Sequence, residues 1–371
     1  MKIHNLKHVG HLDIPGGGQV YVKDRVAYIG HMEPPVGTSV VDVSDPGSPK
    51  ILTQLGVPPT THAHKARVNG NNILVVNRER ISDGPAFRPG IELFDVSVPA
   101  RPRQIAFVET AGVGVHRYDL DDRYVYIASE MEGYRGAISV IYDLSDPVHP
   151  RETGKWWLPG QWTAGGETPA WPGTRHRTHH PLRAGDRLYI GCWFGGYAIA
   201  DITDLARPRT VAYRRYSPPY PAPTHTAMRI PFKLRGRDIM VVSDEHITDE
   251  RLDPCPFLWM VDITDETNPI PIASFIVPET AVTNRAGRFG CHQPQEQLYN
   301  GDTVLAVTWF SGGLRLVDIK DPFQPTEIGY FIPDPVRGFR SAQSNDVFYD
   351  GNGLLYMIDR YNGLDILERR R

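Results

Sequence analysis

Val41-Asp42-Val43-Ser44-Asp45-Pro46 is the first of seven segments built on one pattern, an aspartate between apolar residues that usually precedes Ser or Thr and a proline turn. The other six are Phe94-Asp95-Val96-Ser97-Val98-Pro99, Tyr142-Asp143-Leu144-Ser145-Asp146-Pro147, Ala200-Asp201-Ile202-Thr203-Asp204, Val261-Asp262-Ile263-Thr264-Asp265, Val317-Asp318-Ile319-Lys320-Asp321-Pro322 and Leu364-Asp365-Ile366. The aspartates are 53, 48, 58, 61, 56 and 47 residues apart. These intervals are typical of β-propeller blades and too long for helical solenoid repeats.

The sequence around each segment predicts strands. An apolar run follows a short turn upstream, as in Asn69-Gly70-Asn71-Asn72 before Ile73-Leu74-Val75-Val76, and a second proline and another apolar run follow downstream. Turns rich in Asn, Asp and Gly between β-prone runs indicate hairpins, and prolines end strands. No stretch has the periodicity of an amphipathic helix. The pattern therefore predicts that each unit is a four-stranded antiparallel meander. The repeated aspartates are expected to accept backbone N–H groups in the turn that follows.

The last repeat is incomplete, because the chain ends at Leu367-Glu368-Arg369-Arg370-Arg371, directly after the Asp365 strand. The run at residues 5–14 resembles the outer strands of the other units. A strand there would complete the final blade and remove the open edges of the ring. We therefore predict an all-β, seven-bladed propeller as a single domain over residues 1–371, with the N-terminal strand 5–14 pairing with the C-terminal blade 341–371.

Composition narrows the function classes. The net charge of -3 gives no electrostatic case for nucleic acid or an anionic membrane. The first residues lack the apolar core of a signal peptide, and no apolar run approaches the length of a membrane span. Three cysteines without CxxC spacing predict free thiols in a cytoplasmic protein. The exposed rim of a propeller leaves room for a homodimer.

Two repeat segments, Leu316-Val317-Asp318-Ile319 and Val41-Asp42-Val43-Ser44-Asp45-Pro46, resemble the LVIVD-repeat propeller family. The resemblance extends over the whole chain and implies the fold, while many members of that family have no assigned chemistry. More distantly, the chain resembles two groups of seven-bladed enzymes, the selenium-binding protein / methanethiol oxidase type and the carotenoid oxygenases. Both hold a metal on the axis through histidines, so this resemblance implies metal-dependent oxidation. Fold alone does not establish a function.

Five repeats place a histidine where the innermost strand begins, out of 14 histidines in the chain. At this position blade one has Gly16-Gly17-Gly18-Gln19 and blade seven has Ser344-Asn345-Asp346-Val347-Phe348, without a histidine. Equivalent positions around a ring converge on its axis, and neutral imidazole is a common ligand of Fe, Cu, Mn and Zn. The alternative is a set of polar channel residues bonded to water or backbone. We predict a divalent transition metal, with three or four ligands drawn from a set of five: His64, His116, His180, His225 and His292.

Other residues near this ring are candidates for catalysis and binding. His179 competes with His180 for the same position, since neighbouring residues of a strand face opposite sides. His62 shares a face with His64 and could act as a base. Carboxylates follow the second strands at Glu79, Glu130 and Glu245, where they could orient a histidine or transfer protons. Arg78 and Arg360 occupy similar loop ends and could bind a substrate carboxylate.

Aromatic residues suggest how a substrate is enclosed. A long loop rich in Gly and Pro carries Trp162 and leads to His179, as lids and pocket walls often do. Trp193-Phe194 and Trp309-Phe310 could line a pocket or pack between blades. The first hypothesis is thus a metal-dependent enzyme for a small organic substrate, aromatic or carboxylate-bearing. Redox chemistry is favoured by the family resemblance, and hydrolysis or a lyase reaction stays open. The second is a non-catalytic scaffold for protein partners.

Overall fold

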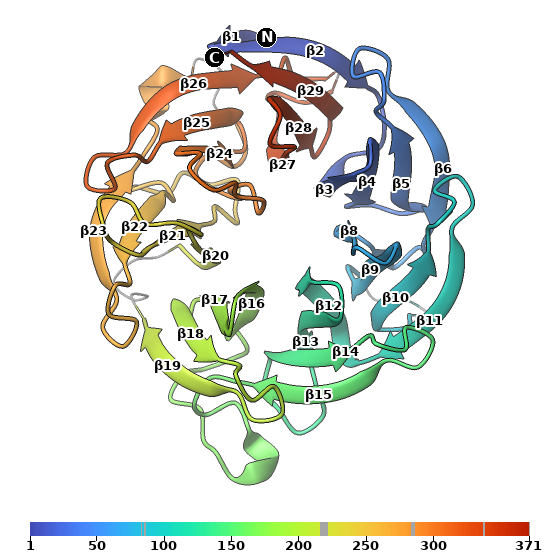
Figure 1. Cartoon of the computed structure of the whole chain (residues 1–371), viewed down its shortest axis with the longest axis vertical. Coiled ribbons are helices and arrows are strands. Elements are labelled where there is room, and N and C mark those ends of the chain that lie inside the picture. Colours follow the sequence, from blue (N-terminus) through green and yellow to red (C-terminus); the bar gives the residue numbers. More distant parts are fainter. Residues whose placement is uncertain (83, 85–86, 216–221, 283–285, 337, 371) are drawn as a thin grey trace.

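The structure, a computed structural model, describes residues 1–370 except 83, 85–86, 216–221, 283–285 and 337. It is a seven-bladed β-propeller, as the repeat predicts, with the blades arranged around a central axis (Figure 1). The blades are antiparallel meanders whose strands are numbered from the axis outwards. No helix in the described part of the chain is long and apolar enough to cross a membrane.

The first four blades follow one another along the chain. Blade one contains β3 (Gly17–Lys23), β4 (Val26–His31), β5 (Val36–Asp42) and β6 (Lys50–Gly56). Blade two contains β7 (Thr61–His62), β8 (Ala66–Val68), β9 (Ile73–Arg80), β10 (Gly90–Asp95) and β11 (Arg103–Glu109). Blade three contains β12 (Ala111–Leu120), β13 (Tyr124–Glu130), β14 (Ala137–Asp143) and β15 (Arg151–Trp156). Blade four contains β16 (His176–Ala184), β17 (Arg187–Trp193), β18 (Tyr197–Asp201) and β19 (Arg209–Arg214).

The last three blades complete the ring. Blade five contains β20 (Thr224–Arg229), β21 (Ile239–Asp244), β22 (Leu258–Asp262) and β23 (Ile270–Phe275). Blade six contains β24 (Val304–Thr308), β25 (Leu314–Asp318) and β26 (Thr326–Ile332), with β1 (Lys2–His4) on its outer edge. Blade seven contains β27 (Ser344–Tyr349), β28 (Leu354–Asp359), β29 (Gly363–Arg369) and the N-terminal strand β2 (Leu6–Leu12). Two short 3₁₀ helices are η1 (Thr163–Gly165) and η2 (Glu279–Ala281).

The predicted closure is confirmed. β2 pairs antiparallel with β29, from Leu6 opposite Arg369 to Leu12 opposite Leu364. The N- and C-termini therefore lie close together, at the neighbouring blades six and seven (Figure 1). The sequence did not predict β1, which pairs with β26 of the neighbouring blade. The start of the chain thus covers the outer edges of two blades, which leaves fewer backbone groups free to pair with another molecule.

The repeated aspartates have the structural role that the sequence predicts. In six repeats the carboxylate accepts the backbone N–H two residues later, at 2.8–2.9 Å. Asp365 differs because the chain continues as β29 instead of turning. It is buried and accepts from His8 Nε2 at 2.8 Å and His11 Nδ1 at 2.9 Å, so the aspartate helps to hold the closing strand.

This contact makes the closure depend on pH. The hydrogen bond to Asp365 raises the pKa of His11 despite partial burial. Its stabilising effect is complete below about 6.5, the ordinary histidine value, and is lost as pH rises through the raised pKa. Because His11 is partly exposed, we expect the melting temperature of the unmodified chain to exceed that of His11→Gln by only about 1–3 °C at pH 5.5. The difference should shrink by pH 8.5. Thermal melts of both proteins across this range measure it, and a constant difference would contradict the linkage.

The innermost strands share an irregularity at the level of the predicted histidines. The pairing register shifts between Gly17 and Val20 in blade one, and equivalent shifts occur in the innermost strands of blades three, four, five and seven. In blade two the break between β7 and β8 lies at residues 63–65. In blade six the inner segment bonds to β24 without forming a regular strand, through His292 N–H to Thr308 O at 3.0 Å. Bulges of this kind turn side chains towards a site.

Candidate metal centre

Imidazole rings from five consecutive blades follow one another around the axis. His64, His116, His179, His225 and His292 have neighbouring ring centroids 4.7, 4.5, 4.5 and 4.4 Å apart. His62 lies at the end of this row, 4.5 Å from His64. All are buried except His116, which is partly exposed. The column of histidines that the repeat register predicts is therefore a continuous arc of imidazoles, and we call these five residues the histidine arc.

Blade four contributes His179 to the arc in place of the predicted His180. His180 also lies at the channel, but its Nε2 accepts from Lys65 Nζ at 2.9 Å and its Nδ1 contacts Thr226 Oγ1 at 3.1 Å. With both ring nitrogens engaged, His180 has no lone pair left for a metal. His179 was expected as a catalytic residue, and its position in the arc makes it a candidate ligand instead.

Hydrogen bonds orient the arc so that Nε2 is the free atom. His179 Nδ1 donates to His225 O at 2.9 Å, and His292 Nδ1 donates to Asn345 O at 2.5 Å. His225 Nδ1 donates to Thr226 Oγ1 at 2.7 Å. An N–H on Nδ1 leaves the Nε2 lone pair available, as in metal-bound histidines. In the described part of the chain, the Nε2 atoms of His179, His225 and His292 are buried without a hydrogen-bond partner.

His64 has a different environment. Asn77 Nδ2 donates to His64 Nδ1 at 3.1 Å, while Asn77 Oδ1 accepts the backbone N–H of Lys65 at 2.9 Å and so fixes the orientation of the amide. The neutral His64 ring then carries its proton on Nε2. His64 therefore faces the site as a hydrogen-bond donor. The sequence had suggested it as a metal ligand.

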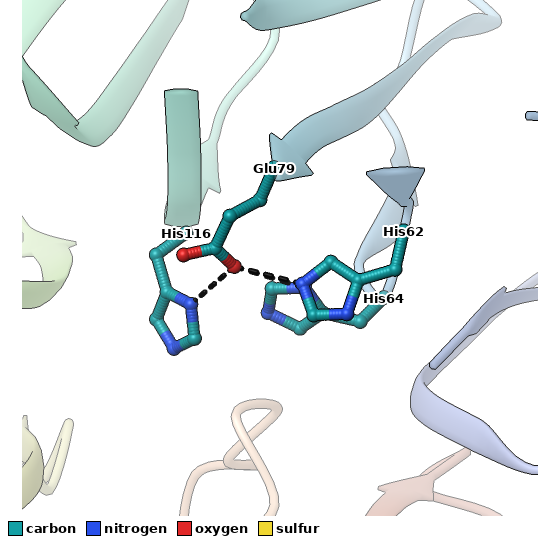
Figure 2. Close-up of side chains that lie close together, drawn as sticks. All are labelled: His62, His64, Glu79 and His116. Atoms are coloured by element: carbon teal, nitrogen blue, oxygen red, sulfur yellow. Dashed lines mark hydrogen bonds and ion pairs between the residues drawn. The ribbon is translucent and has the colours of Figure 1, made fainter. Parts of the chain in front are cut away.

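Glu79 connects the start of the arc to His62. It is the penultimate residue of β9, and Figure 2 shows its carboxylate between His62 and His116. Its Oε2 accepts from His116 Nδ1 at 2.6 Å and His62 Nε2 at 2.8 Å. Burial alone would raise the pKa of Glu79, but the two histidines hold it well below its usual range. A charged carboxylate on Nδ1 fixes the His116 tautomer and makes Nε2 more basic.

Two groups of side chains have the composition and spacing of metal sites. One contains His62, His64, Glu79 and His116, and the other contains His179, His225 and Glu245. In each group one potential donor atom per residue lies within 4.8 Å of the others. In the first group Glu79 already accepts from His62 and His116, and the unpartnered buried Nε2 of His64 carries the ring proton. The second group has two unpartnered buried Nε2 atoms with free lone pairs. The second group therefore has the donors that a metal requires.

Glu245 follows β21 in blade five and faces the arc. Its Oε2 lies 4.0 Å from His225 Nε2 and its Oε1 lies 3.8 Å from His292 Nε2. Oε1 also accepts from Arg288 Nη1 at 3.1 Å. Two imidazoles and one carboxylate are the ligand set of many non-haem Fe(II) oxygenases and of some catalytic zinc sites. Glu245 is thus placed either to bind a metal or to exchange protons beside it.

Burial keeps the arc in the form that binds metals. It is the largest cause that lowers the pKa of His64, His179, His225 and His292 well below the ordinary value. Neighbouring positive charges, including that of Arg117, add to the effect at each of these residues. Neutral imidazole carries the lone pair that coordinates a metal, so the arc can bind near pH 7 without first releasing protons.

The residue after each arc position forms a second polar layer in the channel. Lys65 of blade two donates to Glu296 of blade six at 2.8 Å and to His180 of blade four at 2.9 Å. Bonds between these three blades must cross the axis. Arg67 extends the network through Glu296 at 3.0 Å and through Asp119. Burial alone would raise the pKa of Glu296, but Lys65, His180 and Arg67 hold it well below its usual range. This network is the floor of the site.

Aromatic side chains flank the arc. Trp193 stacks on His179 at 4.5 Å between ring centroids, and Phe310 packs on His292 at 4.6 Å. Both have left-handed backbones, with φ of 53° and 45°, and occupy equivalent turns of blades four and six. Bulky residues rarely adopt this conformation, which concentrates at functional sites. Trp309 precedes Phe310 in the chain and was also a predicted pocket residue. It is fully buried and packs against Phe275.

Three predicted site residues lie elsewhere. Arg78, next to Glu79 on β9, is ion-paired with Glu92 and lines a cavity with Pro58 and Phe107. Trp162 is 41% exposed and packs on Trp157 in the loop that projects outwards beyond β15 and β19 (Figure 1). Glu130 accepts the backbone N–H of Val113 at 3.2 Å and, among the described residues, forms no hydrogen bond with a histidine. Arg360, in contrast, lies 4.0 Å from Glu245.

Sequence reasoning missed Lys65, Arg117, Asn77 and Glu296. Lys65 and Arg117 directly follow arc histidines, so their positions carried a signal. The regular alternation of strand side chains predicted that they would face away. Glu296 and Asn77 had no signal, because their roles arise from contacts across the channel or with the next strand.

These features define a class: a β-propeller with buried histidine–carboxylate groups on its axis that could hold a metal ion. No family model matches the sequence, and no curated protein matches it, so the LVIVD resemblance stays a resemblance.

Three solved structures illustrate the likeness in fold. The computationally designed Ika8 protein covers 98% of this chain and 99% of its own, with a TM-score of 0.55 and 8% identity. Saccharomyces cerevisiae Sqt1 covers 97% and 87%, with a TM-score of 0.56 and 8% identity. A chain from a S. cerevisiae assembly of Dbp5, Nup159, Gle1, IP6 and ADP covers 99% and 95%, with a TM-score of 0.58 and 10% identity. At these identities the likeness concerns the fold alone.

Proposed function

We propose that this protein is a metal-dependent enzyme whose centre is formed by His179, His225 and Glu245, with His116 and His292 beside them. The observation that carries the proposal is the set of buried, unpartnered Nε2 atoms of His179, His225 and His292. Leaving several buried nitrogens without a hydrogen bond costs about 1–3 kcal/mol each. A bound metal ion would remove this cost at the ligand atoms.

The donor set fits oxidoreductase chemistry, and the resemblance to metal-dependent oxidising propellers makes this the first candidate. Two histidines and a carboxylate match non-haem Fe(II) sites, and additional neutral histidines also suit copper or manganese. When bound, such a metal supplies redox chemistry or Lewis acidity. The chain's own residues orient the ligands through the Nδ1 bonds, exclude water by burial and place Glu245 where it can accept or return a proton. The substrate is a small organic molecule that fits between Trp193 and Phe310.

The alternative is a metal-dependent hydrolase or lyase at the same centre, since zinc also binds two histidines and a glutamate. No described feature favours a non-catalytic scaffold, so that hypothesis has no support beyond the habits of the fold.

Metal identity separates the alternatives. The purified full-length chain should contain about one transition-metal ion, measured by elemental analysis, and should regain it after removal with a chelator. Preferential recovery of Fe(II) or Cu(II) over equimolar Zn(II), with oxygen uptake in the presence of small aromatic carboxylates, supports the oxidoreductase. Preferential recovery of Zn(II) favours hydrolase or lyase chemistry. A chain that is purified without metal and binds none would overturn the proposal.

A further inference from the structure

Four arginines lie around the candidate centre. Arg117 follows His116 on β12, and Arg177 lies two residues before His179 on β16. Arg288 and Arg360 approach from blades six and seven, beside Glu245. A divalent metal would increase the positive charge further. An anionic ligand would complement these charges.

Arg117 is the strongest indication of a missing partner. The residue is 3% exposed, and its Nε and Nη1 atoms are buried without a hydrogen bond in the described part of the chain. Its neighbours in the polar layer, Lys65, His180 and Thr226, all have partners. Carboxylates act on the Arg117 charge only without a hydrogen bond, from Asp346, Glu245, Glu296 and Glu79. Leaving buried N–H groups unbonded is costly, and carboxylate and phosphate groups are the partners whose geometry matches a guanidinium. The position next to the arc marks where an anion would lie.

The other three arginines also have few hydrogen-bond or ion-pair partners. Among the described residues, Arg177 forms neither a hydrogen bond nor an ion pair, and its guanidinium lies over Trp193 at 5.4 Å from the ring centroid. Arg288 and Arg360 share one carboxylate, Glu245, at 3.1 and 4.0 Å, and both lie over Phe310. These arginines lie over Trp193 and Phe310, the two aromatic residues that flank the arc, and could bind a second edge of a flat anion.

We expect a ligand to approach the arc from the face that carries these arginines. The network of Lys65, His180 and Glu296 crosses the axis on the other side of the arc. A ligand that enters past Arg177 and Arg288 meets Trp193 and Phe310 as walls and the polar layer with Arg117 below. Flat apolar walls with cationic anchors suit an aromatic or unsaturated carboxylate better than a phosphate, which is compact and strongly hydrated.

We propose that the substrate of this centre is a small carboxylate, whose anionic group is bound by Arg117, with Arg177 as a second anchor at the entrance. The assignment of this carboxylate as a substrate rests on the proposed function, because the metal centre would carry out the reaction. Binding of the anion depends only on the arginines. It replaces the predicted Arg78 as an anion anchor with residues that face the arc.

The test is calorimetric titration of the full-length chain with sodium benzoate and with its neutral counterpart benzamide, both before and after metal removal. Benzoate should bind at least about tenfold more tightly, since a charge-assisted bond at a buried site is worth about 1.5–3 kcal/mol. Arg117→Gln and Arg177→Gln should each weaken benzoate about tenfold or more. Arg117→Lys should recover part of the loss, because it restores the charge. Arg123→Gln, on an exposed arginine paired with Asp143, is the matched control and should change nothing.

The outcomes separate this inference from the proposed function. Equal affinity for benzoate and benzamide, or benzoate affinity unchanged in both Arg117→Gln and Arg177→Gln, would overturn the carboxylate site even if the metal is confirmed. Binding of inorganic phosphate in preference to benzoate would overturn the carboxylate assignment. Benzoate binding by a chain that never takes up metal would uphold the anion site and reject the metal centre. Arg177 is partly exposed, so its variant should fold even if Arg117→Gln does not.

Discussion

A double variant with His179→Ala and His225→Ala should bind no transition metal under conditions that saturate the unmodified chain. Substitutions in the outer shell of metal sites typically cost 10–100-fold in affinity, and direct ligands cost more. The loss of two ligands should therefore weaken binding by more than about 10⁴-fold. Elemental analysis after dialysis and competition with a chelator of known affinity measure the change.

Matched variants show whether the loss is specific. Glu245→Gln removes one anionic donor without changing size and should weaken binding by more than about 100-fold, as expected for a direct ligand. Glu79→Gln should weaken it about tenfold, because it only orients His116. His149→Ala, an exposed histidine on a turn, should leave the metal content unchanged.

The most informative comparison is His180→Ala. If Lys65 and Thr226 occupy the ring nitrogens of His180, this variant keeps its metal and loses stability instead. Full metal content in the double variant His179→Ala/His225→Ala, or loss of metal in His180→Ala without unfolding, would show that the centre is assigned to the wrong residues.

Deletion of residues 1–12 should lower the melting temperature by about 10 °C or more and cause self-association. β2 covers β29, where Leu364, Ile366 and Leu367 are fully buried. Exposing side chains of this kind costs about 1.5–3 kcal/mol each, and 1 kcal/mol corresponds to about 2–4 °C in a large domain. The deletion also removes His8 and His11 from the buried Asp365. The open edge of β29 can then pair with a second chain.

Deletion of residues 1–5 is the control, since it removes β1 and leaves β2 in place. All three residues of β1 are exposed, so the melting temperature should fall by less than about 3 °C. Thermal unfolding followed by circular dichroism, with light scattering for self-association, compares the two deletions. Equal effects would mean that β2 contributes no more than β1 to closing the ring.

The repeat predicted the architecture well because each aspartate has a local task. Asp42 accepts the N–H of Ser44 at 2.8 Å, and a bond over two residues leaves a signature in the sequence of every blade. The closing strand was found for a similar reason: the last repeat lacks a strand, and residues 5–14 have the pattern that completes it. Strand alternation and turn chemistry act over short ranges, so a single sequence contains them.

The site was predicted only in part. The blade register located the histidine column and the approach of Glu79, Glu245 and Arg360 to the axis. Two residues were misplaced. Arg78 is one residue away from Glu79 on the strand and pairs with Glu92 instead of facing the axis. Trp162 lies on a loop that projects outwards and packs on Trp157. The suggestion that Glu79 could orient a histidine agrees with its bonds to both His62 and His116.

The sequence by itself determined the number of blades, the closure of the ring and the position along each inner strand at which chemistry is possible. Tertiary structure decided which of two adjacent residues faces the arc. A regular strand would direct His179 and His180, or His116 and Arg117, to opposite sides. The register shift between His176 and His180 and that between Val115 and Tyr118 interrupt the alternation. Both residues of each pair then contribute to the channel, one in the arc and the other in the polar layer. The bonds across the axis, Lys65 to His180 and Glu296, exist only once the ring has closed, so no local pattern in the sequence could predict them.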